Sequence, residues 1–370
     1  MGAGLGERKP LWHAGFVKIL LADFLVCVSL YMFLPVAFLY VAGNVWAAAL
    51  AFFAGMCLAG PFCNYWLDTF RRKHVALWGV AGVIATTGLF LFDLGATGFC
   101  MARLVQGAAY GVFQIAVGST LLLDLSDSGK RTEAAHVYYW FTRLALAFGP
   151  LAGMVVIHDF GPHLFVVSSL LLSLCAGGVL WTLRVPFRAP LNPSLCSSDR
   201  FWLRRGWRVF VPLFLVVFAS ASLLGGFRGA LPYLCLSLGF WLALTFHVLF
   251  FRERLQAELA AGFLAMFLSF ILYGCGEGWA AVALGCGVGL ATSRYLLSYI
   301  RICTHCERAT AQTSYLLAWE LGLLSGYAMS TTVLKNMECL PLCAGFILLG
   351  TAALFHFVFV RKWYAAHKRK

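Results

Sequence analysis

The sequence predicts an all-α integral membrane protein with twelve transmembrane helices in two pseudo-symmetric six-helix bundles. Composition is the first reason, because 61% of the 370 residues are hydrophobic and only 12% are charged, whereas a soluble domain carries about 25% charge. The second reason is that apolar residues form repeated runs of about 20 residues, the length that crosses a bilayer. The third is that Lys and Arg gather in every second connection between these runs.

Six apolar segments fill the first half of the chain. The first follows a short basic N-terminus, runs well past the length of a signal-peptide core and carries Asp23. We therefore interpret it as a membrane helix rather than a cleaved signal. The six segments are expected at about 16–40, 44–67, 74–93, 97–123, 135–157 and 163–182.

A polar segment with three prolines and several arginines then interrupts the pattern. We expect residues 184–207 to form a cytoplasmic linker between an N-terminal half, 1–183, and a C-terminal half, 208–370. The boundary at Leu231–Pro232 is the least clear of the second half. Its six segments are expected at about 208–231, 234–251, 258–275, 279–300, 312–334 and 340–361.

The basic residues predict the orientation of these helices. With both termini on one side, 23 of the 28 Lys and Arg residues fall on that side, while only Arg228 and Lys335 fall at the opposite ends of the helices. Cytoplasmic loops of membrane proteins carry such an excess. We therefore expect a multi-pass protein of a cell inner (plasma) membrane with both termini in the cytoplasm. The net charge of +13 then reflects topology and not nucleic-acid binding.

The chain also repeats itself. Residues 131–149, RTEAAHVYYWFTRLALAFG, align with residues 308–326, RATAQTSYLLAWELGLLSG, at a constant offset of 177. Arg143 aligns with Glu320. Two similar six-helix halves are typical of secondary transporters. Identical pairs include Arg131 and Arg308, Ala134 and Ala311, Tyr138 and Tyr315, and Gly149 and Gly326.

A polar stripe marks the fourth segment, RLVQGAAYG. Residues three or four positions apart share one face of a helix, and a polar face avoids lipid. The stripe therefore lines a cavity or packs on other helices. Its members are Arg103, Gln106, Tyr110 and Gln114.

Two further motifs lie in the first half. The connection NYWLDTFRRK brings Asp68 next to Arg72 and Lys73 at the end of the second segment. The fifth segment contains AFGPLAG, in which two glycines four residues apart allow close helix packing and the proline bends the helix. The residues of this helix-packing motif are Gly149, Pro150 and Gly153.

These motifs resemble the major facilitator superfamily, in particular its bacterial drug/proton antiporters. NYWLDTFRRK is similar to the family pattern Gly-x-Leu-x-Asp-Arg-x-Gly-Arg-Arg/Lys, RLVQG to Arg-x-x-Gln-Gly, and AFGPLAG to a motif of proton-coupled antiporters. The resemblance implies a gating role for Asp68, Arg72 and Lys73. The sequence departs from the family at Asn64, Thr69, Arg71 and Met154.

Five ionisable residues interrupt apolar helices, and each would cost roughly 2.5–3.5 kcal/mol if left unpaired at the helix centre. Their depths suggest two pairs, Asp23 with Arg143 and Arg294 with Glu320. We expect Asp23 and Glu320 to be proton-coupling residues, with structural ion pairs as the alternative. The substrate-cavity candidates are Arg103, Gln106, Tyr110, Gln114, His136, Tyr139, Trp140, Arg143 and Arg294.

The predicted function is secondary active transport of a small organic solute by alternating access, as proton-coupled efflux. The alternative is uptake, symport or exchange of an anionic metabolite, and a remote one is a membrane scaffold or enzyme. The expected partners are a small-molecule substrate, protons and membrane lipid, with no nucleic acid and a monomeric protein. We expect no cofactor and no metal, and interpret Cys303, His305 and Cys306 as loop residues.

Overall fold

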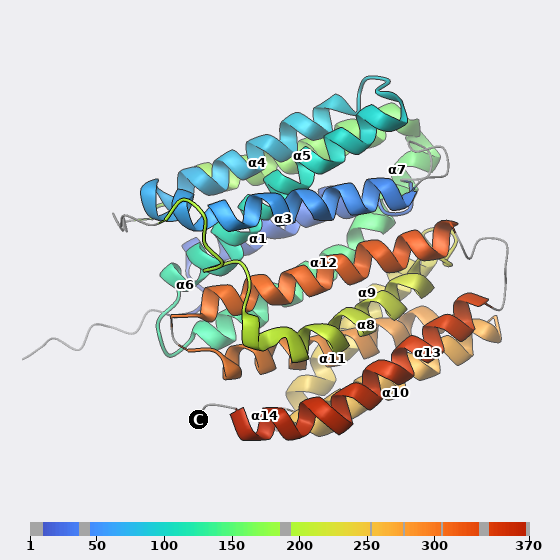
Figure 1. Cartoon of the computed structure of the whole chain (residues 1–370). Coiled ribbons are helices and arrows are strands. Elements are labelled where there is room, and N and C mark those ends of the chain that lie inside the picture. The colour runs from blue at the N-terminus through green and yellow to red at the C-terminus, as the bar shows by residue number, and fades with distance from the viewer. Residues whose placement is uncertain are drawn as a thin grey trace, which may run out of the picture.

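The computed structural model describes residues 10–36, 45–185, 194–251, 254–276, 278–304, 306–332 and 340–367. Within these ranges all regular structure is helical (Figure 1). The first part of the chain forms α1 (Ala14–Tyr31), α3 (Val45–Thr69), α4 (Arg72–Leu89), α5 (Gly95–Ala116), a π-helical turn (Val117–Leu121), α6 (Leu122–Leu125) and α7 (Arg131–Trp181).

The second part of the chain is also helical. It forms a short turn (Arg204–Gly206), α8 (Trp207–Leu224), α9 (Leu231–Phe246), a π-helical turn (His247–Phe251), α10 (Leu255–Gly274), α11 (Ala280–Ile302), α12 (Arg308–Thr332), α13 (Leu340–Phe355), a third π-helical turn (His356–Val360) and α14 (Arg361–His367).

Helix α7 is two helical arms joined at a sharp bend. Gly161 has φ +81° and ψ 177°, a conformation that only glycine adopts without strain. Pro162 follows directly and lacks the N–H that would continue the hydrogen-bond ladder. The arms, 131–160 and 162–181, correspond to the predicted segments 135–157 and 163–182.

Two predicted boundaries are wrong. Helix α8 ends at Leu224 and not at residue 231, because Gly225 and Gly226 follow and α9 starts only at Leu231, with Pro232 in its first turn. Helix α1 ends at Tyr31 and not at residue 40. Residues 37–40 of that predicted segment lie outside the described residues.

Nine helices of the described chain are long and apolar enough to cross a membrane, counting all of α7 once. Helices α4 and α12 fall outside this group. Nearly all of α12 is buried, and it carries small and polar residues on most of its surface. Large apolar side chains point outward elsewhere, among them Leu58, Leu264 and Ile347, each at least 60% exposed. Such a surface is typical of helices that face lipid.

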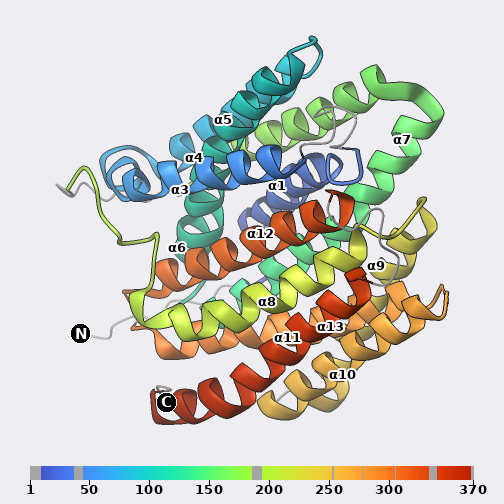
Figure 2. The same ribbon diagram turned by 45° about the vertical axis from the view of Figure 1, so that its right-hand side comes forward.

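The largest helix contacts fall into two groups, one within each part of the chain. Helix α1 packs on α7, α5 packs on α3 and α4, and α4 also contacts α7. Further along, α12 packs on α8, α11 packs on α9 and α10, and α13 packs on α8. Fewer contacts join these groups, through α3 with α12 and through α7 with α9 and α11. Helix α12 accordingly lies between α3 and α8 (Figures 1 and 2).

Glycines permit the closest crossings. A Cβ on Gly149 would lie 2.7 Å from Cβ of Tyr31, and one on Gly153 would lie 2.5 Å from the carbonyl oxygen of Met32. Both glycines of the predicted motif therefore pack against α1 and the turn that follows it. At the position related by the repeat, a Cβ on Gly326 of α12 would lie 2.2 Å from the carbonyl oxygen of Phe218 of α8.

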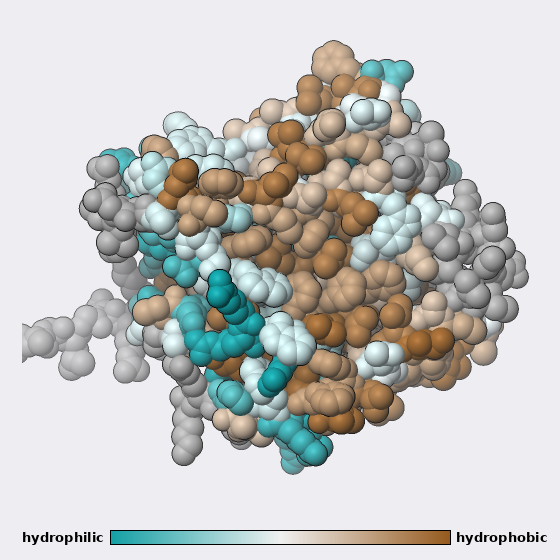
Figure 3. Space-filling model, viewed as in Figure 1, coloured by the Kyte–Doolittle hydropathy of each residue, from teal (hydrophilic) through white to brown (hydrophobic). Residues whose placement is uncertain are grey.

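The first and last described residues lie at the same end of the molecule. There His13 contacts the carbonyl oxygen of Leu125 at 2.9 Å, and Arg208 lies over the ring of Trp363. We call this end, formed by the starts of α1 and α8, the α3–α4 connection and α14, the basic end. On the face seen in Figure 3, apolar side chains cover the middle and hydrophilic ones gather toward this end.

Candidate functional site

Asp23 lies fully buried on α1 and is held by neutral donors. Gln114 Nε2 of α5 donates to its Oδ1 at 2.7 Å, and the Thr142 hydroxyl of α7 donates to its Oδ2 at 2.9 Å. The Cys27 thiol, one turn further along α1, lies 3.8 Å from Oδ1. No cation of the described chain lies within ion-pair distance of Asp23.

The predicted pair of Asp23 with Arg143 is therefore wrong. Thr142 faces α1, and the next residue of an α-helix points about 100° away around the axis. Arg143 consequently points to α12, where its Nη2 donates to the Tyr315 hydroxyl at 2.9 Å. Its guanidinium also lies over the ring of Trp140, 5.1 Å from the centroid.

Glu320 of α12 is held across the interface by two tyrosines. The hydroxyls of Tyr31 on α1 and Tyr110 on α5 donate to its Oε1 at 2.7 and 2.9 Å. Trp319 Nε1 in turn donates to the Tyr31 hydroxyl at 3.2 Å. Glu320 is 1% exposed, so these hydroxyls take the place of water.

The two carboxylates belong to one hydrogen-bonded chain. Gln114 Nε2, which donates to Asp23, lies 3.2 Å from the Tyr110 hydroxyl, which donates to Glu320. The Cys27 sulfur lies 3.6 Å from the same hydroxyl. A buried polar path therefore leads from α1 through α5 to α12.

The second predicted pair, Arg294 with Glu320, is also wrong. Arg294 of α11 forms an ion pair with Glu258 in the first turn of α10. His247, at the end of α9, contacts the same carboxylate at 3.0 Å. The reason is packing, since α11 packs along α10 on the side that carries Arg294, while Glu320 faces α1 and α5.

The remaining residues of the polar stripe on α5 form a second group. Arg103 Nη1 donates to Gln106 Oε1 at 2.6 Å, and Gln106 Nε2 donates to the Thr87 hydroxyl at 2.9 Å. The Arg103 guanidinium lies 4.4 Å from the ring centroid of Phe52. Arg103 also borders a cavity of about 20 Å³ between α3, α5 and α12, which is large enough for one water molecule.

The aromatic face of α7 points toward the second part of the chain. Tyr139 donates to the carbonyl oxygen of Gln312 at 3.2 Å, and Trp140 Nε1 donates to His136 Nε2 at 3.2 Å. The His136 ring contacts the His247 ring, with centroids 4.7 Å apart. These predicted cavity residues lie in a packed seam between α7 and the helices α9, α11 and α12.

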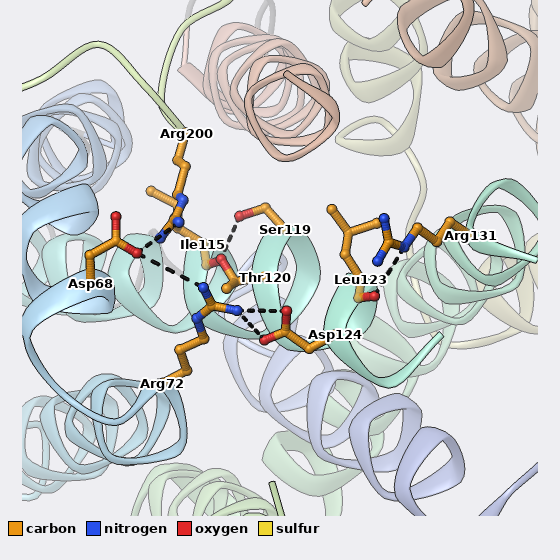
Figure 4. A network of polar contacts seen from close by, with 9 residues as sticks. All are labelled: Asp68, Arg72, Ile115, Ser119, Thr120, Leu123, Asp124, Arg131 and Arg200. Atoms are coloured by element: carbon orange, nitrogen blue, oxygen red, sulfur yellow. Dashed lines mark hydrogen bonds and ion pairs between the residues drawn. The ribbon is translucent and has the colours of Figure 1, made fainter. Parts of the chain in front are cut away.

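The predicted gating residues separate into two places near the basic end. The Asp68 carboxylate forms an ion pair with the Arg200 guanidinium of the linker at 2.8 Å. The Arg72 guanidinium lies 3.9 Å from the same carboxylate (Figure 4). Arg72 also binds both oxygens of Asp124 on α6, at 2.6 and 2.5 Å. Lys73 lies apart from this cluster, with its Nζ donating to the carbonyl oxygen of Trp181 at 2.6 Å.

The linker beyond Asp68 is tied to α12. The backbone N–H of Arg200 donates to the Thr310 hydroxyl at 2.9 Å, and that of Leu203 donates to the Ser314 hydroxyl at 2.8 Å. Nearby, Glu307 pairs with Arg205 outside the membrane-spanning helices. Although partial burial opposes it, hydrogen bonds from Thr304 and Arg205 lower the pKa of Glu307 to about 2. This carboxylate therefore remains charged at physiological pH.

Several contact residues, among them Cys27, Tyr31 and Glu258, were not predicted. Asp23, Cys27 and Tyr31 are spaced by four and share one face of α1, a pattern that could have revealed the first-helix stripe. Glu258 gave no signal, because acidic residues are ordinary in the first turn of a helix. Among the described residues, no three His, Cys, Asp or Glu side chains could hold a metal ion. His305, considered above, lies outside them.

The sequence profile of the Major Facilitator Superfamily matches residues 19–296. The chain belongs to this superfamily. The predicted family is thereby confirmed, and the chain is a multi-pass membrane transporter of small molecules rather than an enzyme. No curated protein matches the sequence.

Solved structures of the superfamily share the fold. The POT family transporter PepTSo is similar with a TM-score of 0.69 and 13% identity, over 98% of this chain and 100% of that one. The human organic anion transporter MFSD10 gives 0.64 and 14%, over 94% and 99%. The nucleoside transporter NupG gives 0.62 and 16%, over 94% and 99%. Identities this low establish a common fold only.

Proposed function

We propose that this superfamily member is a secondary active transporter that couples the movement of a small organic solute to protons. One observation carries the proposal. Two buried carboxylates, Asp23 and Glu320, lie in a single hydrogen-bonded chain that crosses from α1 and α5 to α12. Neither has a cationic partner among the described residues, so protonation of either breaks no ion pair.

The proposed architecture has twelve spanning helices, obtained by counting the two arms of α7 separately and by adding α4 and α12. The halves are 1–183 and 208–370, joined by the linker 184–207, of which 186–193 lie outside the described residues. The equivalent contacts of Gly149 with α1 and Gly326 with α8 support this division. The basic end would face the cytoplasm of an inner membrane, and the protein would act as a monomer.

The depth of the carboxylates supports a role in coupling. Asp23 lies about 14 Å along α1 from Ala14, and Glu320 about 18 Å along α12 from Arg308, at 1.5 Å per residue. Both depths are close to the middle of a hydrocarbon core about 30 Å thick. Transporters with repeated halves bind substrate and coupling ions at this level.

Protonation of Glu320 supplies a physical link between proton and movement. Hydrogen bonds to a carboxylate are roughly twice as strong as those between neutral groups. A protonated Glu320 would therefore hold Tyr31 and Tyr110 less tightly. Because these tyrosines lie on the opposite side of the interface, protonation favours separation of α12 from α1 and α5, which is the movement that alternating access requires.

The motif of Gly149, Pro150 and Gly153 supports efflux by antiport, since it resembles the antiporter signature. A second candidate is proton symport or exchange of an organic anion. It is favoured by Arg143, a buried arginine between α7 and α12 that has no acidic partner among the described residues. The sign of the proton movement separates the two.

A flux experiment tests the proposal. Purified protein in liposomes with an internal pH-sensitive dye would be given ethidium, benzoate or phenyl phosphate in turn. We expect one of these solutes to dissipate an imposed pH gradient with the wild type, and at least a tenfold slower proton flux with Glu320→Gln and Asp23→Asn. Antiport and symport give proton movements of opposite direction.

Glu133→Gln is the matched control, because Glu133 is an exposed acid in the first turn of α7. This variant should couple like the wild type. Substrate exchange without a pH gradient should persist in Glu320→Gln. If both membrane acids can be replaced without slowing the proton flux, they do not carry the coupling proton.

A further inference from the structure

Arg143 is a buried cation whose hydrogen-bond donors are only partly used. Its side chain is 1% exposed, and only Nη2 has a partner, the Tyr315 hydroxyl. Nε and Nη1 are buried without an acceptor within the described chain. A buried charge without a counter-charge is unfavourable, and arginine stays protonated inside proteins. The fold therefore holds a positive charge that a ligand can neutralise.

The surroundings of Arg143 are aromatic and come from both parts of the chain. Trp140 lies under the guanidinium, and the rings of Tyr139 and Tyr315 contact each other with centroids 4.9 Å apart. From α11, Gly289 lies so close that an added Cβ would be 3.0 Å from the Trp140 ring. The guanidinium thus sits where α7, α11 and α12 meet.

The acids of this region are occupied elsewhere. Asp23 accepts from Gln114 and Thr142, and Glu320 accepts from two tyrosines. Glu258 is bound by Arg294 and His247. None of these carboxylates forms an ion pair with Arg143, although Asp23 contacts the residue next to it in the chain.

We propose that Arg143 binds the negatively charged group of the transported solute, and that the solute is an organic anion with an aromatic or apolar body. This inference rests on the proposed function and names its substrate class. The carboxylate or phosphate oxygens accept hydrogen bonds from Nε and Nη1, while Tyr139, Trp140 and Tyr315 contact the body. Because α7 and α12 belong to different proposed halves, a solute that contacts both helices is bound by both halves.

A binding experiment without a gradient tests this assignment. Thermal unfolding of the detergent-solubilised protein would be followed with benzoate, benzyl alcohol and benzylamine, which share one ring and differ in charge, and with phenyl phosphate. We expect benzoate or phenyl phosphate to raise the unfolding midpoint of the wild type, and the neutral and cationic probes to leave it unchanged. Affinity for the anion should fall at least tenfold in Arg143→Gln and less in Arg143→Lys.

Arg361→Gln is the control for a general loss of positive charge, because Arg361 is an exposed arginine at the start of α14. It should bind the anions like the wild type. The assignment is overturned if neither anion stabilises the wild type, if benzylamine stabilises it more than benzoate, or if Arg143→Gln binds the anions unchanged. The comparison of probes on the wild type stands even if the variants fold poorly.

The outcome is independent of the proton test. Binding is measured at one pH, without a membrane potential or a gradient. Anion binding that depends on Arg143 would survive a finding that Glu320 carries no proton. Conversely, proton coupling through Glu320 would survive a finding that the solute is a cation.

Discussion

Tyr31 and Tyr110 join the two parts of the chain through one carboxylate. Their hydroxyls converge on one oxygen of Glu320 in a region without exposed surface. A hydrogen bond to a charged group contributes about 1.5–3 kcal/mol, more than a neutral one. These two tyrosines should therefore matter more than the many other buried tyrosines of the protein.

Replacing Tyr31 by Phe should lower the free energy of unfolding by about 1.5–3 kcal/mol where Glu320 is ionised. Chemical unfolding in mixed micelles would measure this change in the free energy of unfolding. Tyr295→Phe is the matched control, since the Tyr295 hydroxyl is buried without a hydrogen-bond partner in the described chain. That change should be neutral or stabilising. Equal losses in both variants would show that the Glu320 contact contributes nothing special.

Sequence reasoning predicted that Asp23 and Glu320 lie within membrane helices, but it did not predict which residues they contact. Asp23 and Glu320 stand out because an apolar run makes an acid conspicuous. Their partners depend on helix rotation, and neighbouring residues such as Thr142 and Arg143 point about 100° apart. A depth count alone cannot distinguish them, and both predicted ion pairs failed for this reason.

At the scale of elements, equivalent glycines set the distance between paired helices. Gly149 lets α7 approach α1, and Gly326 lets α12 approach α8. In each case the neighbour is partly backbone, which cannot rotate out of the way. These crossings therefore fix the helices more rigidly than a contact between flexible side chains would.

Gly326→Ala should force α8 and α12 apart, because its Cβ would lie 2.2 Å from the Phe218 carbonyl oxygen. We expect a loss of about 1–3 kcal/mol, as in other overpacked cores, measured as a lower unfolding midpoint and a lower folded yield. Gly178→Ala is the control, since nothing lies within 4 Å of its Cβ position. A helical glycine replaced there should be neutral or slightly stabilising. Similar behaviour of the two variants would contradict the packing argument.

Most elements could be predicted from apolar run length alone, whereas their ends could not. Run length cannot locate the end of α8, because Gly225, Gly226 and Phe227 add no charge to the apolar run before Arg228, while the two glycines end the helix. The bend of α7 was predictable as a break between two segments. Its geometry rests on a single glycine with positive φ, which hydropathy does not register.

On the scale of the whole molecule, the linker fastens the basic end. Arg200 binds Asp68 of α3 through its side chain and Thr310 of α12 through its backbone. It does so with φ +60°, a conformation that costs a non-glycine residue about 1–2 kcal/mol. The contacts on both sides offset this strain, so releasing one of them should loosen the segment.

Asp68→Asn should therefore increase deuterium uptake in residues 194–203, measured by hydrogen exchange and mass spectrometry. Asp124→Asn is the control, because it breaks the pair with Arg72 that joins α4 to α6 and leaves Arg200 in place. Faster exchange of the linker in both variants, or in neither, would mean that Asp68 does not hold it.

The overall fold was the most predictable level, since hydropathy, charge alternation and the repeat all indicate the same architecture. The closed packing around Arg143 was not predictable, because it depends on how the parts of the chain meet. A sequence repeat indicates how each part of the chain folds, but it does not predict which residues of the two parts contact each other.

The sequence repeat bears on the symmetry of the protein's interior. Arg143 and Glu320 occupy the same place in the two copies of the unit, 177 residues apart. Two identical copies would carry the same residue there, and because such halves are related by an axis along the membrane normal, the interior would look alike on its left and right sides. Opposite charges at this one position give the interior an electrical polarity, so that a charged solute meets unlike surroundings on its left and right, and the ancestral symmetry no longer describes the chemistry.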